Sequence, residues 1–519
     1  MRPGFAGLVG AMGLVLFGVL GVGAEPPDER LLSDIQPAER EQVAGRIEGL
    51  PEYTITAQID ELTGTITGTM SVRFTNRSAD ALTDLWFRLF PNIAYYGEGD
   101  LAVTAVAVDG AAATSELGLE ETALRVMLAE PLEMGSSTTV DLAFETTVPV
   151  DSLGSYGIFS RDSAAGIWVL ADWYPILAVY EPDSGWNLPP PSSAGDPTFA
   201  ESSMYDVRLT VPESLVPVAT GVEVSQDTAA GMSTYDIVGG PARDFTLVLT
   251  RDYATVVREA GGVRIVVAAP NGSPTAAELD QAAEIAVQAL QVFEERFGPY
   301  PFTELDIVET RLNRALAVSW AGVIFVDGGA LARWGSGQDR ASLETLIAHE
   351  IAHLWWGAML NADSNLHPFI NEGLSTLSAA LYQFDVNDPE TAALQVERWI
   401  GSPVDRLVWA GDQIVDLPAA EGDALNSRYE AIYGKSTVGF LAIREALGPD
   451  VFDAVLRGVV ADEMFSVYTP DDLRQAFAEA PGADPALINS LWSRWFEETL
   501  LTAEEADQAI QALIAEPRP

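Results

Sequence analysis

The first half of the chain alternates apolar and polar residues, the pattern of half-buried strands. In TGTITGTMSVRF, apolar Ile66, Met70, Val72 and Phe74 fall on one face and polar side chains fall on the other. Similar short segments, separated by turn signals, occur at residues 101–108, 140–144, 205–211 and 245–249. This pattern predicts an antiparallel, sandwich-like β domain over residues 51–258.

The period changes near residue 273, where helical patterns replace the alternation. Thr275 and Glu278 form a capping-box pattern, which predicts a helix that ends at Phe297 before Gly298. Short strands are expected near 305–309 and 322–326. Further helices are expected near residues 342–360, 370–384, 389–400, 434–447, 450–461, 470–479 and 485–515. The fold class predicted is therefore α+β multidomain, with a mixed sheet and a helical part forming a second domain over 259–519.

The N-terminal segment has the composition of a targeting sequence. Residues 1–24 carry one early charge at Arg2, then an apolar stretch and small residues up to Ala24, which predicts a cleaved signal peptide. The alternative is a retained membrane anchor, because the stretch from Pro3 to Ala24 is uncharged. Residues 25–50 are interpreted as a linker or leading helix. We expect an extracytoplasmic protein, secreted or periplasmic, or else one anchored at its N-terminus.

Charge and cysteine content narrow the function classes. The formal net charge is -48, which argues against nucleic-acid binding because phosphate contacts need clustered Lys and Arg. The chain has no cysteine, so disulfides and thiolate metal sites are excluded. Nothing in the composition indicates an oligomeric state.

All three histidines of the chain fall within residues 349–373, HEIAHLWWGAMLNADSNLHPFINEG. His349 and His353 are four residues apart in an H-E-x-x-H pattern, so on a helix they lie one above the other on the same face. Both imidazoles can then reach one ion at the roughly 2.0 to 2.1 Å typical of zinc, with Glu350 directed to the same cleft. Buried structural histidines are the alternative.

A third ligand is expected from the segment that follows. A catalytic zinc needs three protein ligands and an open position, and Glu372 of NEG follows His353 after eighteen intervening residues. His367, in the loop before it, is interpreted as a solvent-exposed histidine outside the metal set. Hydrogen-bond partners for the ligand histidines are left open among Asp363, Ser375 and Ser378.

HEIAHLWWG and the NEGL segment, with eighteen residues between His353 and the glutamate of NEGL, resemble the gluzincin metallopeptidases of the aminopeptidase N family. FRLFPN and DWYPILAVYEPDSGW resemble that family's N-terminal domain, and the segment from Tyr433 to Ser436 is similar to its Y-E-K-G segment. The resemblance implies a thermolysin-like catalytic domain with one Zn²⁺ per chain on His349, His353 and Glu372. It further implies Glu350 as general base and Tyr433 as hydrogen-bond donor to the tetrahedral intermediate.

The pattern departs from the family where substrate is bound. Family aminopeptidases carry G-x-M-E-N before the zinc helix, and its glutamate binds the free amino terminus of the substrate. Here Ser319 and Trp320 stand in place of the glutamate and asparagine, with Gly322 following, and these three are the candidate substrate-binding residues. A serine cannot form the charge-assisted bond of a carboxylate with an ammonium group.

The sequence therefore predicts a secreted zinc metallopeptidase that hydrolyses peptide bonds with metal-activated water, and leaves exopeptidase and endopeptidase action open. Two other classes are also open: a metallohydrolase acting on a non-peptide bond, and an exported binding or assembly module without catalysis. Lys435, the single lysine of the chain, lies next to the Tyr433 segment for a reason that the sequence does not reveal.

Overall fold

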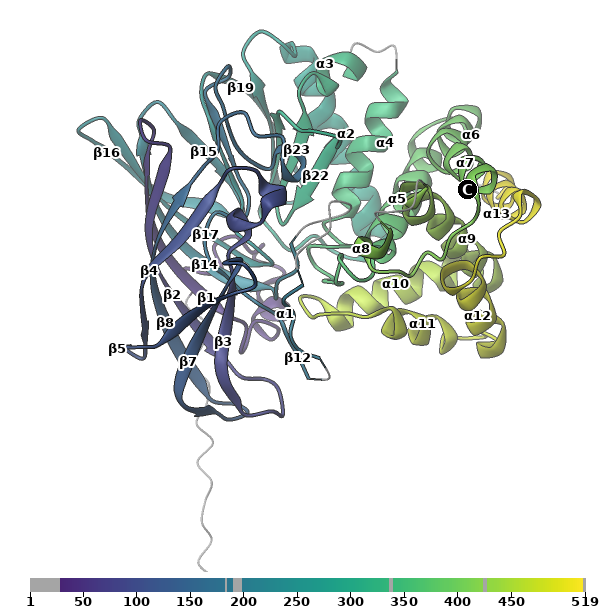
Figure 1. Cartoon of the computed structure of the whole chain (residues 1–519). Coiled ribbons are helices and arrows are strands. Elements are labelled where there is room, and N and C mark those ends of the chain that lie inside the picture. Colours follow the sequence, from purple (N-terminus) through teal and green to yellow (C-terminus); the bar gives the residue numbers. More distant parts are fainter. Residues whose placement is uncertain (1–28, 183, 190–197, 336–338, 423–426, 517–519) are drawn as a thin grey trace, which may run out of the picture.

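The computed structural model describes residues 29–182, 184–189, 198–335, 339–422 and 427–516 (Figure 1). The predicted signal peptide, residues 1–24, lies outside these ranges. Within them, no helix combines the length and apolar character needed to cross a membrane. Strands of the N-terminal half lie on one side of the molecule, helices of the C-terminal half lie on the other, and a mixed sheet lies between them. The α+β multidomain prediction is confirmed.

The N-terminal half is built on an eight-stranded sheet. Its order is β16-β17-β14-β1-β2-β8-β4-β5, and every neighbouring pair is antiparallel except β1 with β14. The strands span β1 (Glu52–Asp60), β2 (Thr65–Thr75), β4 (Asp100–Val108), β5 (Ala111–Ala112), β8 (Ser137–Thr147), β14 (Ser203–Pro212), β16 (Val222–Ala229) and β17 (Met232–Ala242). In β1 and β2 the alternate residues are buried, as the sequence pattern predicts.

Smaller sheets complete this half and cover the buried face. One has the order β11-β3-β7-β6, another β15-β18-β10-β9, and β12 pairs with β13 as a two-stranded ribbon. Their bounds are β3 (Leu82–Arg88), β6 (Ser115–Gly118), β7 (Ala123–Leu132), β9 (Phe159–Asp162), β10 (Ile167–Leu170), β11 (Ile176–Leu177), β12 (Tyr180–Glu181), β13 (Gly185–Trp186), β15 (Val216–Ala219) and β18 (Leu247–Thr250). Tyr53, Tyr174 and Tyr205 contact one another at the centre of the resulting core.

A five-stranded mixed sheet begins the second half, in the order β19-β20-β21-β23-β22. β20, β21 and β23 are parallel, while β19 and β22 are antiparallel edges. The strands are β19 (Tyr253–Ala260), β20 (Val263–Pro270), β21 (Glu304–Thr310), β22 (Ala317–Trp320) and β23 (Val323–Asp327). Helix α2 (Ala276–Phe297) lies between β20 and β21 in the chain, and Thr275 and Glu278 form its predicted capping box.

Helices make up the rest of the second half. They are α3 (Ala330–Gly335), α4 (Arg340–Ala352), α5 (Pro368–Val386), α6 (Pro389–Val396), α7 (Ser402–Ala410), α8 (Ala419–Gly422), α9 (Ser436–Leu447), α10 (Pro449–Glu463), α11 (Pro470–Ala478), α12 (Pro485–Trp492) and α13 (Ala503–Ala515). The prediction of a helix over 342–360 is wrong at its end, because α4 stops at Ala352 and the chain then turns through Gly357 at φ +150°.

The prediction of one helix over 485–515 is also wrong, and Lys435 is the physical reason. The Lys435 ammonium is fully buried and donates to Asp412 Oδ1 at 2.8 Å and to the carbonyl of Glu498 at 2.7 Å. Asp412 Oδ2 accepts the amide of Leu501 at 2.8 Å. These contacts hold the chain in a non-helical turn between Glu497, where the helical segment that begins with α12 ends, and α13, so the single lysine has a structural role.

Residues 29–50 are not an extended linker, because they pack on the second half of the chain. The segment contains the short helix α1 (Arg40–Ala44), and Leu32, Ile35 and Val43 belong to the same buried apolar cluster as α2 and α4. The amide of Gln36 donates to the carbonyl of Pro301 at 2.8 Å. The earliest described residues therefore complete a core formed by much later ones.

Candidate metal centre

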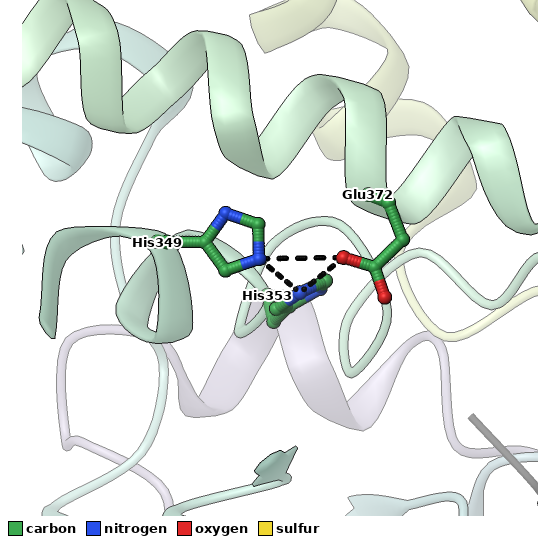
Figure 2. Close-up of side chains that lie close together, drawn as sticks. All are labelled: His349, His353 and Glu372. Carbon is green, nitrogen blue, oxygen red and sulfur yellow. Dashed lines mark hydrogen bonds and ion pairs between the residues drawn. The ribbon is translucent and has the colours of Figure 1, made fainter. Parts of the chain in front are cut away.

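Two helices bring His349, His353 and Glu372 together. His349 lies in the last turn of α4, His353 directly follows its last residue, and Glu372 lies in the first turns of α5. Most residues of both helices are buried, so packing holds the two helices in place. The side chains of His349, His353 and Glu372 point toward one another (Figure 2). The three sequence-predicted ligands therefore share one place.

The distances fit a tetrahedral ion. His349 Nε2 and His353 Nε2 lie 3.3 and 3.2 Å from Glu372 Oε2, and 3.1 Å from each other. Ligands at roughly 2.0 to 2.1 Å from a tetrahedral zinc are about 3.3 Å apart. Glu372 Oε2 is buried and has no hydrogen-bond donor among the described residues. Three potential ligand atoms at this spacing could hold a metal ion, and they are the group of this kind found among the described residues.

Contacts behind His353 set its tautomer. Its Nδ1 lies 3.2 Å from the carbonyl oxygen of Trp356 and 3.0 Å from Ser375 Oγ. A carbonyl can only accept, so Nδ1 carries the hydrogen and the Nε2 lone pair is left for a metal. Of the partners left open from the sequence, Ser375 is in contact, whereas Ser378 Oγ accepts from the Trp356 indole at 2.9 Å.

The partner of His349 and the position of Asp363 were not foreseen. Thr376 Oγ1 lies 3.5 Å from His349 Nδ1. Asp363 Oδ2 instead accepts a hydrogen bond from Asn187 Nδ2 at 2.8 Å, which joins the two halves of the chain. Nothing in the sequence distinguishes Thr376 from its neighbour Ser375 as a partner of a ligand histidine. A main-chain carbonyl such as that of Trp356 has no residue-type signal.

Electrostatic coupling within the triad is strong. Burial alone lowers the pKa of His353, but the Glu372 carboxylate outweighs it and raises the pKa to about 9. Burial in turn raises the pKa of Glu372, yet the two imidazoles hold it well below its usual range. The carboxylate is therefore ionised, and positive charge between it and the histidines is favoured.

Glu350 and Tyr433 lie at the same place. Glu350 is buried, and Ser319 Oγ donates to its Oε2 at 2.6 Å and lies 3.0 Å from its carbonyl oxygen. The Tyr433 ring is 5.9 Å from the His349 ring and stacks on Tyr429 at 4.2 Å. Burial, followed by the Glu372 charge, raises the pKa of Tyr433 well above its usual value, so the phenol stays a donor.

Two of the candidate substrate-binding residues are placed elsewhere. Ser319 lines the cleft over the metal centre, but Trp320 is 2% exposed and packs on Phe325 with ring centroids 4.4 Å apart. Trp320 follows Ser319 on β22, so its side chain points to the opposite face of the sheet. Gly322, at φ +76°, forms the turn into β23 and is not among the described residues that line the cleft.

The centre opens into a cleft of about 760 Å³. Its walls include β22, which is an unpaired edge on the side away from β23, and residues of both halves of the chain such as Tyr156 and Tyr433. His367 does not take part, because its Nδ1 pairs with Asp416 Oδ1 at 2.6 Å at the start of α5. The predicted loop histidine is thus half-exposed and bound to an acid.

Comparison with known proteins identifies the same region. Residues 281–495 match the peptidase family M1 domain. Aminopeptidase 2 of Candida albicans is 24% identical over 242 residues, which are 44% of this chain and 25% of that protein. Aminopeptidase M1 of Arabidopsis thaliana is 27% identical over 227 residues, which are 42% of this chain and 25% of that protein. The chain spans about a quarter of the length of the curated relatives that it matches.

Solved structures share the fold over nearly the whole chain. A mutant M1 zinc metallopeptidase from Deinococcus radiodurans superposes with a TM-score of 0.63 at 17% identity, covering 87% of this chain and 96% of that one. The same protein bound to a Tyr-Ser-Ala substrate gives 0.63 at 16% identity, covering 88% and 96%. At such identity the likeness is one of fold, and it extends through both halves of the chain. One zinc ion per chain is what this fold and the ligand triad together imply.

Proposed function

We propose, since residues 281–495 match the peptidase family M1 domain, that this protein is a zinc-dependent metallopeptidase that hydrolyses peptide bonds. The observation that carries the proposal is the triad of His349, His353 and Glu372, with ligand atoms 3.1 to 3.3 Å apart beneath an open cleft. When bound, zinc supplies Lewis-acid chemistry that polarises the scissile carbonyl and makes water acidic enough to ionise near neutral pH.

Two further side chains would perform proton transfer and charge stabilisation. Glu350 would take the proton of the attacking water and deliver it to the leaving nitrogen, a role that fits its place between the two ligand histidines in sequence and in the lining of the cleft. Tyr433 would donate its phenolic hydrogen to the oxyanion that develops on the substrate carbonyl. Its raised pKa supports that role, because the proton is retained at neutral pH.

The substrate would be a peptide lying along β22. An exposed edge strand binds an extended peptide through main-chain hydrogen bonds, and β22 forms one wall of the cleft. By its resemblance to the family's G-x-M-E-N segment, Ser319 would stand where the family's aminopeptidases have a glutamate for the free amino terminus. We therefore propose that recognition does not depend on a free ammonium group, so that both free and blocked peptides are cleaved.

The test combines metal analysis with hydrolysis by the wild type and Glu350→Gln. Internally quenched peptides would be offered with a free and with an acetylated amino terminus. Retained zinc with loss of turnover in the variant, and comparable kcat/KM for both peptides in the wild type, is the expected result. Full activity of Glu350→Gln would remove Glu350 as base. Strict dependence on the free terminus would make the protein an ordinary aminopeptidase.

We also propose that the protein is exported. The uncharged, apolar stretch up to Ala24, followed by a polar segment, supports this. Mass spectrometry of the protein recovered from culture medium or periplasm should find a new amino terminus near residue 25. An intact N-terminus in a membrane fraction would instead support the retained anchor.

A further inference from the structure

The cleft has a charge distribution opposite to that of the whole chain. Formal net charge is -48, yet Glu350 and Glu372, both at the metal centre, are the acids among the described residues that line the cleft. Three arginines line it as well: Arg243, Arg314 and Arg428. The basic residues of the cleft lining therefore contrast with the acidic composition of the whole chain.

Arg243 and Arg428 are committed to the protein. Arg428 is buried and donates to the carbonyl oxygens of Ile414, Val415 and Leu417. Arg243 is buried as well, and its Nη1 lies 3.4 Å from the carbonyl of Thr198. Both contribute positive charge, but neither presents a free fork to a ligand.

Arg314 differs because it is exposed to the cleft. Within the part of the chain that the structure describes, it has neither an ion pair nor a hydrogen bond, although the chain has 76 acidic residues. Its backbone has φ +65°, a conformation that non-glycine residues rarely adopt and that neighbouring contacts must hold. Such a residue is a candidate for function rather than for packing.

The contacts that hold this loop come from both halves of the chain. The amide of Asn313 donates to the carbonyl of Tyr156 at 2.8 Å, and its Nδ2 donates to the carbonyl of Leu153 at 2.8 Å. On the other side of Arg314, the Asp327 amide donates to the carbonyl of Leu316 at 2.9 Å. The loop is so close to the β half that a Cβ on Gly157 would lie 2.7 Å from the Arg311 carbonyl oxygen. Arg314 therefore lies in a loop that hydrogen bonds hold in place on both sides.

The place of Arg314 relative to β22 indicates on which side of the cleaved bond it would contact the substrate. Antiparallel pairing is the commoner and more stable arrangement, so a bound peptide would run opposite to β22. With the cleaved bond near Ser319, which contacts Glu350, residues C-terminal to that bond would run toward Arg314. Five residues of extended chain span at most about 17 Å, and the arginine side chain shortens the gap.

We infer that Arg314 recognises a carboxylate on the C-terminal side of the cleaved bond, within about five residues, and so selects acidic or carboxy-terminal peptide segments. This inference rests on the proposed peptidase function. Guanidinium and carboxylate form bidentate, charge-assisted hydrogen bonds, which is the pairing that the exposed fork offers. The carboxylate can come from the chain terminus or from an Asp or Glu side chain.

The experiment compares neutral, acetylated and amidated quenched peptides with matched sets carrying one carboxylate. One set has a free C-terminus, one has Glu in place of Gln on the C-terminal side, and one has the same exchange on the N-terminal side. For the wild type we expect kcat/KM about tenfold higher with a C-terminal-side carboxylate than for its neutral match. The ratio should fall to about one in Arg314→Gln. It should persist in Arg311→Gln, a matched exposed arginine of the same loop that does not line the cleft.

Binding measurements test the inference without depending on turnover. Calorimetry with Glu350→Gln should give a Kd about tenfold lower for the carboxylate peptide than for its amide, and Glu350→Gln/Arg314→Gln should give equal values. The inference is overturned if Glu350→Gln binds the carboxylate peptide and its amide equally. It is also overturned if the preference for the carboxylate peptide survives Arg314→Gln. Turnover of neutral peptides without a carboxylate preference refutes only the inference, whereas zinc-loaded wild type that cleaves no peptide refutes the proposed function.

Discussion

Ser319 Oγ donates a hydrogen bond of 2.6 Å to Glu350 Oε2, so the serine that we propose to stand in place of the family's substrate-binding glutamate contacts the candidate base. The strand that forms the cleft wall and the helix that holds the metal ligands are thereby joined at the reacting centre. The hydrogen bond orients the Glu350 carboxylate, which makes Ser319 a positioning residue.

Ser319→Ala should therefore lower kcat by about tenfold with little change in KM. A hydrogen bond to a charged group is worth roughly 1.5 to 3 kcal/mol, and only its orienting part is lost in the transition state. Steady-state kinetics on a neutral peptide measure the effect. Ser319→Thr keeps the hydroxyl and should recover most of the rate. A serine that served only folding would instead lower the melting temperature and leave the kinetics of the folded fraction intact.

Tyr433→Phe should reduce kcat by about 100- to 1000-fold, the usual cost of removing one oxyanion donor. The ring lies beside His349 and stacks on Tyr429, so phenylalanine preserves the packing. Zinc content and the circular dichroism spectrum should match those of the wild type. Unchanged kcat in the variant would assign the oxyanion to another donor.

Ser375→Ala should weaken zinc binding by about tenfold. Its hydroxyl is one of two partners of His353 Nδ1, and removing an outer partner of a metal ligand commonly costs 10- to 100-fold in affinity. The Trp356 carbonyl remains and keeps the tautomer, so the loss should be at the lower end. Competition with a chromophoric chelator measures it, with Ser378→Ala as the control because Ser378 contacts the Trp356 indole rather than an imidazole. Equal affinities of the two variants would contradict the assignment.

Lys435→Met should destabilise the fold by about 3 to 5 kcal/mol, the typical result of leaving a buried charge without its partner. Burial lowers the pKa of Lys435 while Asp412 opposes that shift, which is the signature of a buried pair. Denaturant unfolding measures the loss. Lys435→Met combined with Asp412→Asn should lose less than the two single variants added together. Strict additivity would mean that the two residues act separately.

Glu309 should make the protein less stable as the pH rises from about 5 to 8. Burial, and then Asp327, raise its pKa from 4.5 to about 7, so the folded state holds a proton that the unfolded state releases. Stability from this group is complete below pH 4.5 and is lost as the pH passes 7. Glu309→Gln removes the titration and should gain about 1 to 3 kcal/mol at pH 8 and little at pH 5. A stability difference that does not change with pH would show that Glu309 does not titrate there.

The sequence predicted what local spacing determines and missed what tertiary contacts determine. His349, His353 and Glu372 were foreseen because helical periodicity alone aligns the first two and a following helix supplies the third. Thr275 capped its helix as expected for the same local reason. The break between α12 and α13 was not foreseen, because it depends on Lys435 and Asp412, which are distant in sequence from it.

Side-chain direction on β22 was the other limit. A four-residue edge strand carries too little alternation to be recognised, so Ser319 and Trp320 were grouped although they point to opposite faces. One of them contacts Glu350, and the other is packed in an apolar cluster with Phe325. The buried carbonyl that orients His353 has no residue-type signal, so no sequence pattern could have found it.

The packing of Leu32, Ile35 and Val43 onto the core of α2 and α4 means that the molecule cannot be divided by one cut in the chain. A fragment that starts at β19 would expose an apolar groove where these side chains belong. The apolar side chains of this early segment become buried only when the later elements α2 and α4 are in place. An isolated second half would therefore require residues 29–50 to be joined to its amino end, rather than the simple removal of the β half.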